Sequence, residues 1–277
     1  TKDDIGSPGD KNDTNNPPEF APAVGDDDDV TFDVPADAYR VTTAAELEAA
    51  VAAGETTILL ADGEYNADMN ATTGKTLKLY GESKNAVLKS TKEGSEGADY
   101  DFDGSTVSFN GLTIDTSSHT GSYKGWARMN GTYNDCVIIG EHCLYGTSEF
   151  NYCTLNTSGD NYNIRTWGAD SVEFNNCTFN SSGKALLVYG EYVTTDVKVD
   201  ACEFNDDETT DFVKAAIETG SDRKPNDYYT ITVTNTVVNG FAINTTNCSD
   251  VNSTLWANKN GLDHNNLNVV VDGVDVY

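Results

Sequence analysis

Short runs of β-branched and aromatic residues, separated by Asn, Gly, Ser, Thr and Asp, make up most of the chain after residue 54. Apolar runs bounded by such turn-forming residues are typical of β-strands. A helical pattern precedes them at 43–53. It has Leu47, Ala50 and Val51 on one face, the capping-box pair Thr43 and Glu46, and the closing Gly54. The pattern therefore predicts one helix followed by an all-β structure.

The runs share one pattern of positions. An aromatic or aliphatic residue comes first, and the next position is usually Asn or Asp. Any residue follows, then a small apolar residue, and another apolar residue two places further on. The small apolar column is Leu112, Cys136, Cys153, Cys177, Cys202, Thr236 and Val274. Spacings from Cys136 to Thr236 are 17, 24, 25 and 34 residues. An imperfect period of about 20 to 30 residues is typical of a β-solenoid with one coil per repeat.

A polar column precedes the small apolar one by two residues. Its members are Asn110, Asn134, Asn151, Asn175, Asp200, Thr234 and Asp272. Stacked coils place equivalent residues about 4.8 Å apart. We therefore expect a buried ladder of free thiols in the first column, and hydrogen-bonded side chains at a left-handed bend in the second.

The N-terminal segment differs from the rest of the chain. Residues 1–38 contain all but one of the six prolines and the acidic run Asp26 to Asp29, with little apolar periodicity. Such a segment buries too little surface to offset its ordering entropy, so we expect a flexible acidic tether, followed by one domain at 39–277. A Ca²⁺ site in the Asp run is the alternative, which repulsion between adjacent carboxylates disfavours.

Charge narrows the range of partners. The 17 Lys+Arg and 45 Asp+Glu residues give a formal net charge of −28. This charge argues against binding to nucleic acids or anionic membranes, and no apolar run approaches the roughly 18 residues of a membrane-spanning helix. Polyuronates would also be repelled unless Ca²⁺ bridged them, so neutral or mildly substituted glycans fit better.

Two stretches carry a family resemblance. TTAAELEAAVAAGETTILLADGEY, which ends at Tyr65, and KTLKLYGESKNAVLKS, from Lys75, resemble the opening of the pectate-lyase-like right-handed parallel β-helix superfamily. The resemblance extends from about residue 40 to 277. It implies an all-β, single-stranded right-handed parallel β-helix with an N-terminal capping helix, and it is specific for fold rather than for activity.

The first residues carry a second resemblance. The acidic KDD from Lys2, followed by a polar tether, is similar to the segment after the lipidated Cys in surface lipoproteins of gut Bacteroidota. This resemblance implies a secreted or cell-surface protein, anchored by lipid at the N-terminus in the outer membrane. A secreted protein without lipid is the alternative.

The motifs that mark enzymes of the superfamily are missing from the sequence. There is no polygalacturonase-like set, no W-x-D-H, no pectin-esterase signature and no GGxGxD repeat. His119, His142 and His264 lack metal-ligand spacing, so we expect surface positions for them and no metal site.

In this superfamily the ligand groove usually lies along one sheet. That sheet is formed by the strands that follow each pair of short Asn-bearing strands. Alternation along these strands predicts that Ala127, Met129, Leu144, Ile164, Thr166, Leu186 and Val188 point inward. It turns Arg128, Tyr145, Arg165, Trp167, Leu187 and Tyr189 outward. We expect Tyr145, Trp167 and Tyr189 to form one exposed column that stacks on sugar rings, with Arg165 and Arg128 beside it. The alternative is that these aromatic residues only cover the sheet.

Three functions remain open. The pattern favours a non-catalytic, cell-surface carbohydrate-binding or adhesin-like module without a cofactor. The first alternative is a polysaccharide lyase or glycoside hydrolase with an atypical site: Arg165 and Lys184 would carry the catalysis, and Glu191, Glu218 or Asp170 would bind Ca²⁺. The second alternative is a structural spacer or protein-binding stalk.

Overall fold

The computed structural model of the protein is all-β apart from one helix in the part it describes. The described residues are 32–67, 75–89, 106–117, 127–157, 162–182, 184–190, 194–207, 215–220, 227–241, 250–251, 254–258 and 262–277. Their strands form two sheets, of 15 and 8 strands. Every pairing is parallel except those of β20 with β21 and of β22 with β23.

The larger sheet contains β1 (Tyr39–Val41), β2 (Thr57–Leu60), β4 (Thr76–Gly81), β6 (Thr106–Asn110), β8 (Ala127–Asn134), β10 (His142–Asn151), β12 (Ile164–Asn175), β14 (Leu186–Tyr189), β15 (Thr194–Asp200), β17 (Ile217–Gly220), β18 (Tyr228–Thr234), β20 (Asp250–Val251), β21 (Trp256–Asn258), β22 (Leu267–Val271) and β23 (Val274–Asp275). The smaller sheet contains β3 (Gly63–Asn66), β5 (Ala86–Lys89), β7 (Thr113–Asp115), β9 (Val137–Ile139), β11 (Thr154–Asn156), β13 (Thr178–Ser181), β16 (Glu203–Asp206) and β19 (Val237–Asn239).

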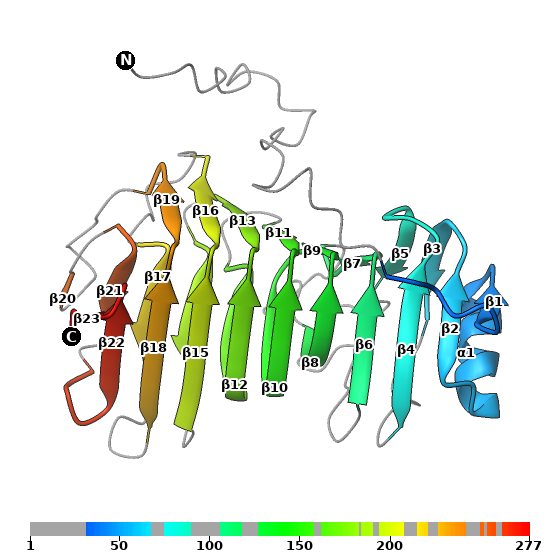
Figure 1. Ribbon diagram of the computed structural model, residues 1–277, viewed down its shortest axis with the longest axis horizontal. Helices are drawn as coiled ribbons and strands as arrows, with labels where there is room; N and C mark the ends of the chain where they lie inside the picture. Colours follow the sequence, from blue (N-terminus) through cyan, green and yellow to red (C-terminus); the bar gives the residue numbers. More distant parts are fainter. Residues whose placement is uncertain are drawn as a thin grey trace.

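The chain alternates between the two sheets. Strands β6, β8, β10 and β12 of the larger sheet are each followed by the next strand of the smaller sheet. Successive strands then lie beside their predecessors and run parallel to them, in a row that leads from α1 at one end to β22 at the other (Figure 1). This stacking of layers puts residues that are one repeat apart in the sequence next to each other.

The larger sheet divides at β12. The end of β12, Ser171–Asn175, pairs with β15, whereas its start pairs with β14 through Ile164 and Arg165. We call β14, β17, β21, β20 and the starts of β8, β10 and β12 the short branch, and the rest of the larger sheet the long branch. Register shifts between β10 and β12, on either side of Tyr145, mark the division.

The predicted helix is confirmed as α1 (Ala44–Ala53), with its three predicted apolar residues buried. The backbone N–H of Glu46 donates to the Thr43 hydroxyl at 3.2 Å, and Gly54 ends the helix in the left-handed conformation. The Glu46 carboxylate accepts from the N–H and hydroxyl of Thr42, rather than from Thr43 as a capping box would require. These bonds lower the pKa of Glu46, the backbone bond more than the hydroxyl bond. No helix in the described part is both long and apolar enough to cross a membrane.

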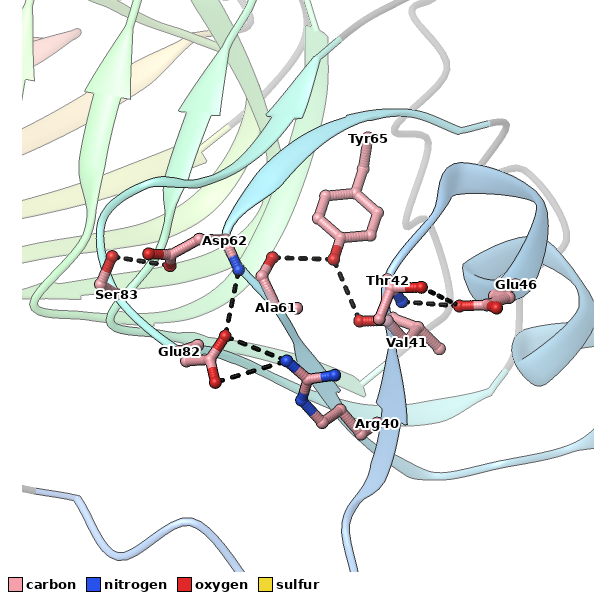
Figure 2. Close-up of polar contacts among 9 residues, drawn as sticks. All are labelled: Arg40, Val41, Thr42, Glu46, Ala61, Asp62, Tyr65, Glu82 and Ser83. Atoms are coloured by element: carbon pink, nitrogen blue, oxygen red, sulfur yellow. Dashed lines mark hydrogen bonds and ion pairs between the residues drawn. The ribbon is translucent and has the colours of Figure 1, made fainter.

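The turn at residues 62–65, with the sequence Asp-Gly-Glu-Tyr, connects the first layers (Figure 2). The Tyr65 hydroxyl donates to the carbonyl oxygens of Val41, at 3.1 Å, and Ala61, at 2.8 Å. In the same turn, Asp62 accepts from the Ser83 hydroxyl and donates its N–H to Glu82. Strand β1 and the turn that follows β4 are thereby held to this bend.

Aromatic side chains stack through the interior of the long branch. The rings of Phe109, Tyr133, Phe150 and Phe174 follow one another at centroid distances of 4.8, 4.5 and 4.9 Å. Phe179 and Phe204 stack in the same way inside the smaller sheet, at 4.4 Å. At these distances the rings of neighbouring layers are in contact through the interior.

The thiol ladder is confirmed. Cys136, Cys153, Cys177 and Cys202 are buried free thiols, and the N–H of Cys177 donates to the sulfur of Cys202 at 3.4 Å. Burial raises the pKa of the first three thiols well above the usual value, because a buried thiolate loses its hydration.

The Asn ladder is confirmed, but the position of its bend is corrected. Asn134 donates to Asn110 at 2.9 Å, Asn151 to Asn134 at 3.1 Å, and Asn175 to Asn151 at 3.0 Å. The left-handed backbone falls on the residue after each of the first six ladder positions. These residues are Gly111, Asp135, Tyr152, Asn176, Ala201 and Asn235, with φ between 48° and 65°. Extended backbone at the ladder residue lets its amide face the next layer, while its neighbour makes the turn.

A second Asn ladder, which the sequence analysis did not identify, follows the smaller sheet. Asn180 donates to Asn156 at 2.8 Å, Asn205 to Asn180 at 3.3 Å, and Asn239 to Asn205 at 2.9 Å. The signal was present in the sequence, because each of these residues follows its small apolar column member by three residues.

The C-terminal end departs from the predicted columns. Asp272 and Gly273 both have positive φ, 48° and 79°, and turn β22 back into the antiparallel strand β23. Asp-Gly readily forms such a two-residue hairpin turn. Val274, which we expected in the buried column, is therefore 62 % exposed, because the chain reverses instead of passing to the smaller sheet.

Candidate functional site

The candidate site lies on the outer side of the short branch. The predicted inward positions of Met129, Leu144, Ile164, Thr166, Leu186 and Val188 are all confirmed as buried. Ala127 and Arg128 lie in β8, with their side chains outside the described part; by register, Arg128 is opposite Cys143. Cys143, Arg165, Leu187 and Glu218 are Cα partners on successive strands, so alternation places all four on the outer side.

The middle of this outer side is shielded from solvent. Cys143 and Glu218 are each only 1 % exposed, and Leu187 is 2 % exposed. Leu187 therefore lies on the outer side, as predicted, but is covered there. Alternation fixes the side of a strand on which a residue lies, but not whether other parts of the chain cover that side.

Trp167 and Tyr189 lie on the same side of the sheet, two residues further along β12 and β14 than Arg165 and Leu187. Their rings stack at a centroid distance of 5.2 Å with an interplanar angle of 27°, and both side chains are partly exposed. The contact confirms that these two aromatic residues are neighbours on adjacent strands. Partial exposure leaves aromatic surface available at the margin.

Tyr145 is displaced from the expected column. The shifted register places it opposite Gly168, not Trp167, and a Cβ atom added to Gly168 would lie 2.5 Å from Cδ1 of the Tyr145 ring. The ring therefore lies directly over the glycine backbone. The prediction of one regular column of three aromatics is corrected, because the irregular pairing at the end of the short branch moves Tyr145 along by one residue.

Arg165 is held by two side chains that the sequence analysis did not single out. Its Nε forms an ion pair with Oε1 of Glu141, and its guanidinium carbon lies 5.3 Å from the centre of the Tyr162 ring. The Lys184 ammonium lies 5.7 Å from the same ring. The side chain of Arg165 is 23 % exposed, and that of Glu141 is 3 % exposed. Glu141 precedes Cys143 by two residues, so alternation could have placed it on the same side as Arg165.

The residues considered for Ca²⁺ binding lie in different environments. Asp170 is exposed, Glu218 is buried, and Glu191 lies outside the described residues. Across the described ranges, no group of three or more His, Cys, Asp and Glu side chains has a geometry that could hold a metal ion.

The histidines do not share one environment. His142 is fully buried, with Nε2 at 3.1 Å from the Ile139 carbonyl oxygen and 3.4 Å from the Thr116 hydroxyl, so its predicted surface position is wrong. Polar neighbours inside the fold compensate this ring for lost water. His264 is exposed, as expected, and stacks on Tyr277 at 4.3 Å. His119 lies outside the described residues.

The arrangement suits binding better than proton transfer. A guanidinium keeps its proton and acts only as a hydrogen-bond donor, and here a carboxylate and a ring fix its position. The partly exposed ring pair beside it offers flat apolar surface to a ligand.

Comparisons with protein-family models, curated proteins and solved structures found no match for this chain.

Proposed function

We propose that this protein is a non-catalytic carbohydrate-binding module, and that glycan binds on the outer side of the short branch. The observation that carries the proposal is the partly exposed stack of Trp167 on Tyr189, in which Trp167 lies on the same strand and side as Arg165. Sugar rings present C–H faces that pack on aromatic rings, and their hydroxyl groups accept hydrogen bonds from guanidinium groups.

The proposal also covers the fold family of the module and its location in the cell. The two parallel sheets and the Asn ladder support assignment of the fold to a right-handed parallel β-helix of the pectate-lyase-like superfamily. A binder of external polysaccharide would be secreted or held at the cell surface, where a lipid anchor at the N-terminus would display it. The prediction of a lipid anchor rests on the acidic segment that begins at Lys2, and this segment lies outside the described residues.

The test is native affinity electrophoresis through gels that contain plant or host polysaccharides, with and without Ca²⁺. We expect at least one polysaccharide to retard the wild-type protein, and Trp167→Ala to weaken this binding about tenfold or more, because stacking area is lost. The matched control is Tyr228→Ala, which removes an exposed aromatic residue, 37 % exposed, from the long branch.

Three outcomes are distinguishable in these gels. Equal retardation of wild type and Trp167→Ala would contradict the aromatic site, and free migration in every gel would contradict glycan binding altogether. Clearing of the polysaccharide around the band would favour the lyase or hydrolase alternative.

A further inference from the structure

Asn-Gly pairs are places at which a protein chain can modify itself. The chain has four of them, which begin at Asn110, Asn130, Asn239 and Asn260. The backbone nitrogen of the glycine attacks the side-chain carbonyl carbon of the asparagine, and this approach is open because glycine has no Cβ atom. The reaction requires an asparagine side chain that can move and a glycine N–H that no acceptor holds. The fold therefore decides which pairs react; the pair at Asn260 lies outside the described residues.

The Asn239–Gly240 pair lies at the end of the smaller sheet. Strand β19, which ends at Asn239, is the last strand of that sheet in the described part of the chain, and Asn239 and Gly240 are both exposed. Gly140 holds the equivalent position in an inner layer, where its N–H donates to the Asn156 carbonyl oxygen at 2.9 Å. The N–H of Gly240 donates to none of the described residues, because no described strand of this sheet follows β19. Its nitrogen is therefore available for attack.

Two of the other pairs are protected by the fold. Asn110 is 5 % exposed, and the N–H of Gly111 donates to the Asn134 carbonyl oxygen at 3.0 Å. Asn130 is 8 % exposed, and Gly131 lies within the paired strand β8. Attack at either pair first requires the local structure to open.

We propose that Asn239 is a site of spontaneous deamidation, a modification that is independent of glycan binding. The Gly240 nitrogen forms a bond to Cγ of Asn239, and the side-chain nitrogen leaves as ammonia with the proton of the Gly240 N–H. The product is a cyclic succinimide between the two residues. Water then opens the ring at either carbonyl carbon and leaves aspartate or isoaspartate. Water is the only other reactant, so the step needs no enzyme and no oxidant.

The product changes the end of the second Asn ladder. Nδ2 of Asn239 donates to Oδ1 of Asn205 and to Oε1 of Glu203, both at 2.9 Å and both exposed, so water competes for these bonds before the reaction. An aspartate at this position can only accept hydrogen bonds and carries the same charge as Glu203. Isoaspartate also lengthens the main chain by one methylene group. We therefore expect deamidation to loosen β19 from β16, the strand with which it pairs.

The test incubates the folded protein at mildly alkaline pH in water enriched in heavy oxygen, and follows each Asn-Gly pair by peptide mapping with mass spectrometry. Heavy oxygen taken up from the solvent marks deamidation that occurred during the incubation, and fragmentation of the peptides locates it. We expect Asn239 to deamidate about tenfold faster than Asn110, or more, because Asn110 reacts only when its surroundings open.

The same incubation in urea is the matched control, because both pairs then lack the fold. Their rates should come within about threefold of each other, so that a difference in the folded protein reports structure rather than sequence. Asn239→Gln, which lengthens the side chain and hinders ring closure, should abolish the uptake at this position and leave that at Asn110 unchanged. Asn239→Asp, which carries the charge of the product, should melt at a lower temperature than Asn239→Ala.

Two results would count against this inference. Deamidation of Asn239 at a rate equal to or below that of Asn110 in the folded protein would overturn the site. Equal melting temperatures for Asn239→Asp and Asn239→Ala would overturn the expected loosening of β19. Neither result depends on whether any polysaccharide retards the protein, so the proposed function is tested separately.

Discussion

At the residue scale, side-chain amides join the layers of the long branch. Asn151 donates to Asn134 at 3.1 Å and accepts from Asn175 at 3.0 Å, so its removal leaves a partly buried group without its partner in each neighbouring layer. Loss of a buried hydrogen-bond partner costs about 1–3 kcal/mol. We predict that Asn151→Ala lowers the free energy of unfolding by about this amount, as measured by urea denaturation.

The matched control is Asn239→Ala at the exposed end of the second ladder. Asn239 donates to Asn205 and Glu203, and water can replace it there. Its substitution should cost less than about 1 kcal/mol. Equal losses for the two variants would mean that the ladder adds nothing beyond ordinary surface hydrogen bonds.

At the scale of elements, the junction of β10 and β12 sets the shape of the candidate site. Tyr145 lies over the backbone of Gly168, where a Cβ would approach its ring to 2.5 Å. We predict that Gly168→Ala displaces this ring and destabilises the fold by about 1–3 kcal/mol, which thermal or urea unfolding would measure.

A double-mutant cycle isolates the cause. In a Tyr145→Ala background the ring is gone, and the added methyl group should then cost less than about 0.5 kcal/mol. If Gly168→Ala is equally costly in both backgrounds, its effect lies in the backbone rather than in the contact with Tyr145.

The sequence predicts regular features of these elements better than irregular ones. The helix, the thiol column and the inward residues such as Leu144 and Ile164 follow from periodicity and caps, which are local. The displacement of Tyr145 does not, because a register shift depends on how two strands pair. The Glu141–Arg165 pair joins the residue before β10 to a residue of β12, and the burial of Leu187 depends on what covers the sheet.

At the scale of the whole molecule, net charge limits the glycans that the proposed site could bind. A chain with a formal net charge of −28 repels polyanions at long range, whereas a neutral glycan avoids this cost. The partly exposed stack of Trp167 on Tyr189 is the part of the described surface on which the proposed function depends.

The most direct test of glycan binding at this surface is hydroxyl-radical footprinting of the wild-type protein, read by mass spectrometry, with and without a polysaccharide that retards it in gels. We predict that the glycan protects Trp167 and Tyr189 from oxidation and leaves the exposed Tyr228 of the long branch unchanged. Protection at Tyr228 with no change at Trp167 would contradict the account, because the glycan would then bind elsewhere.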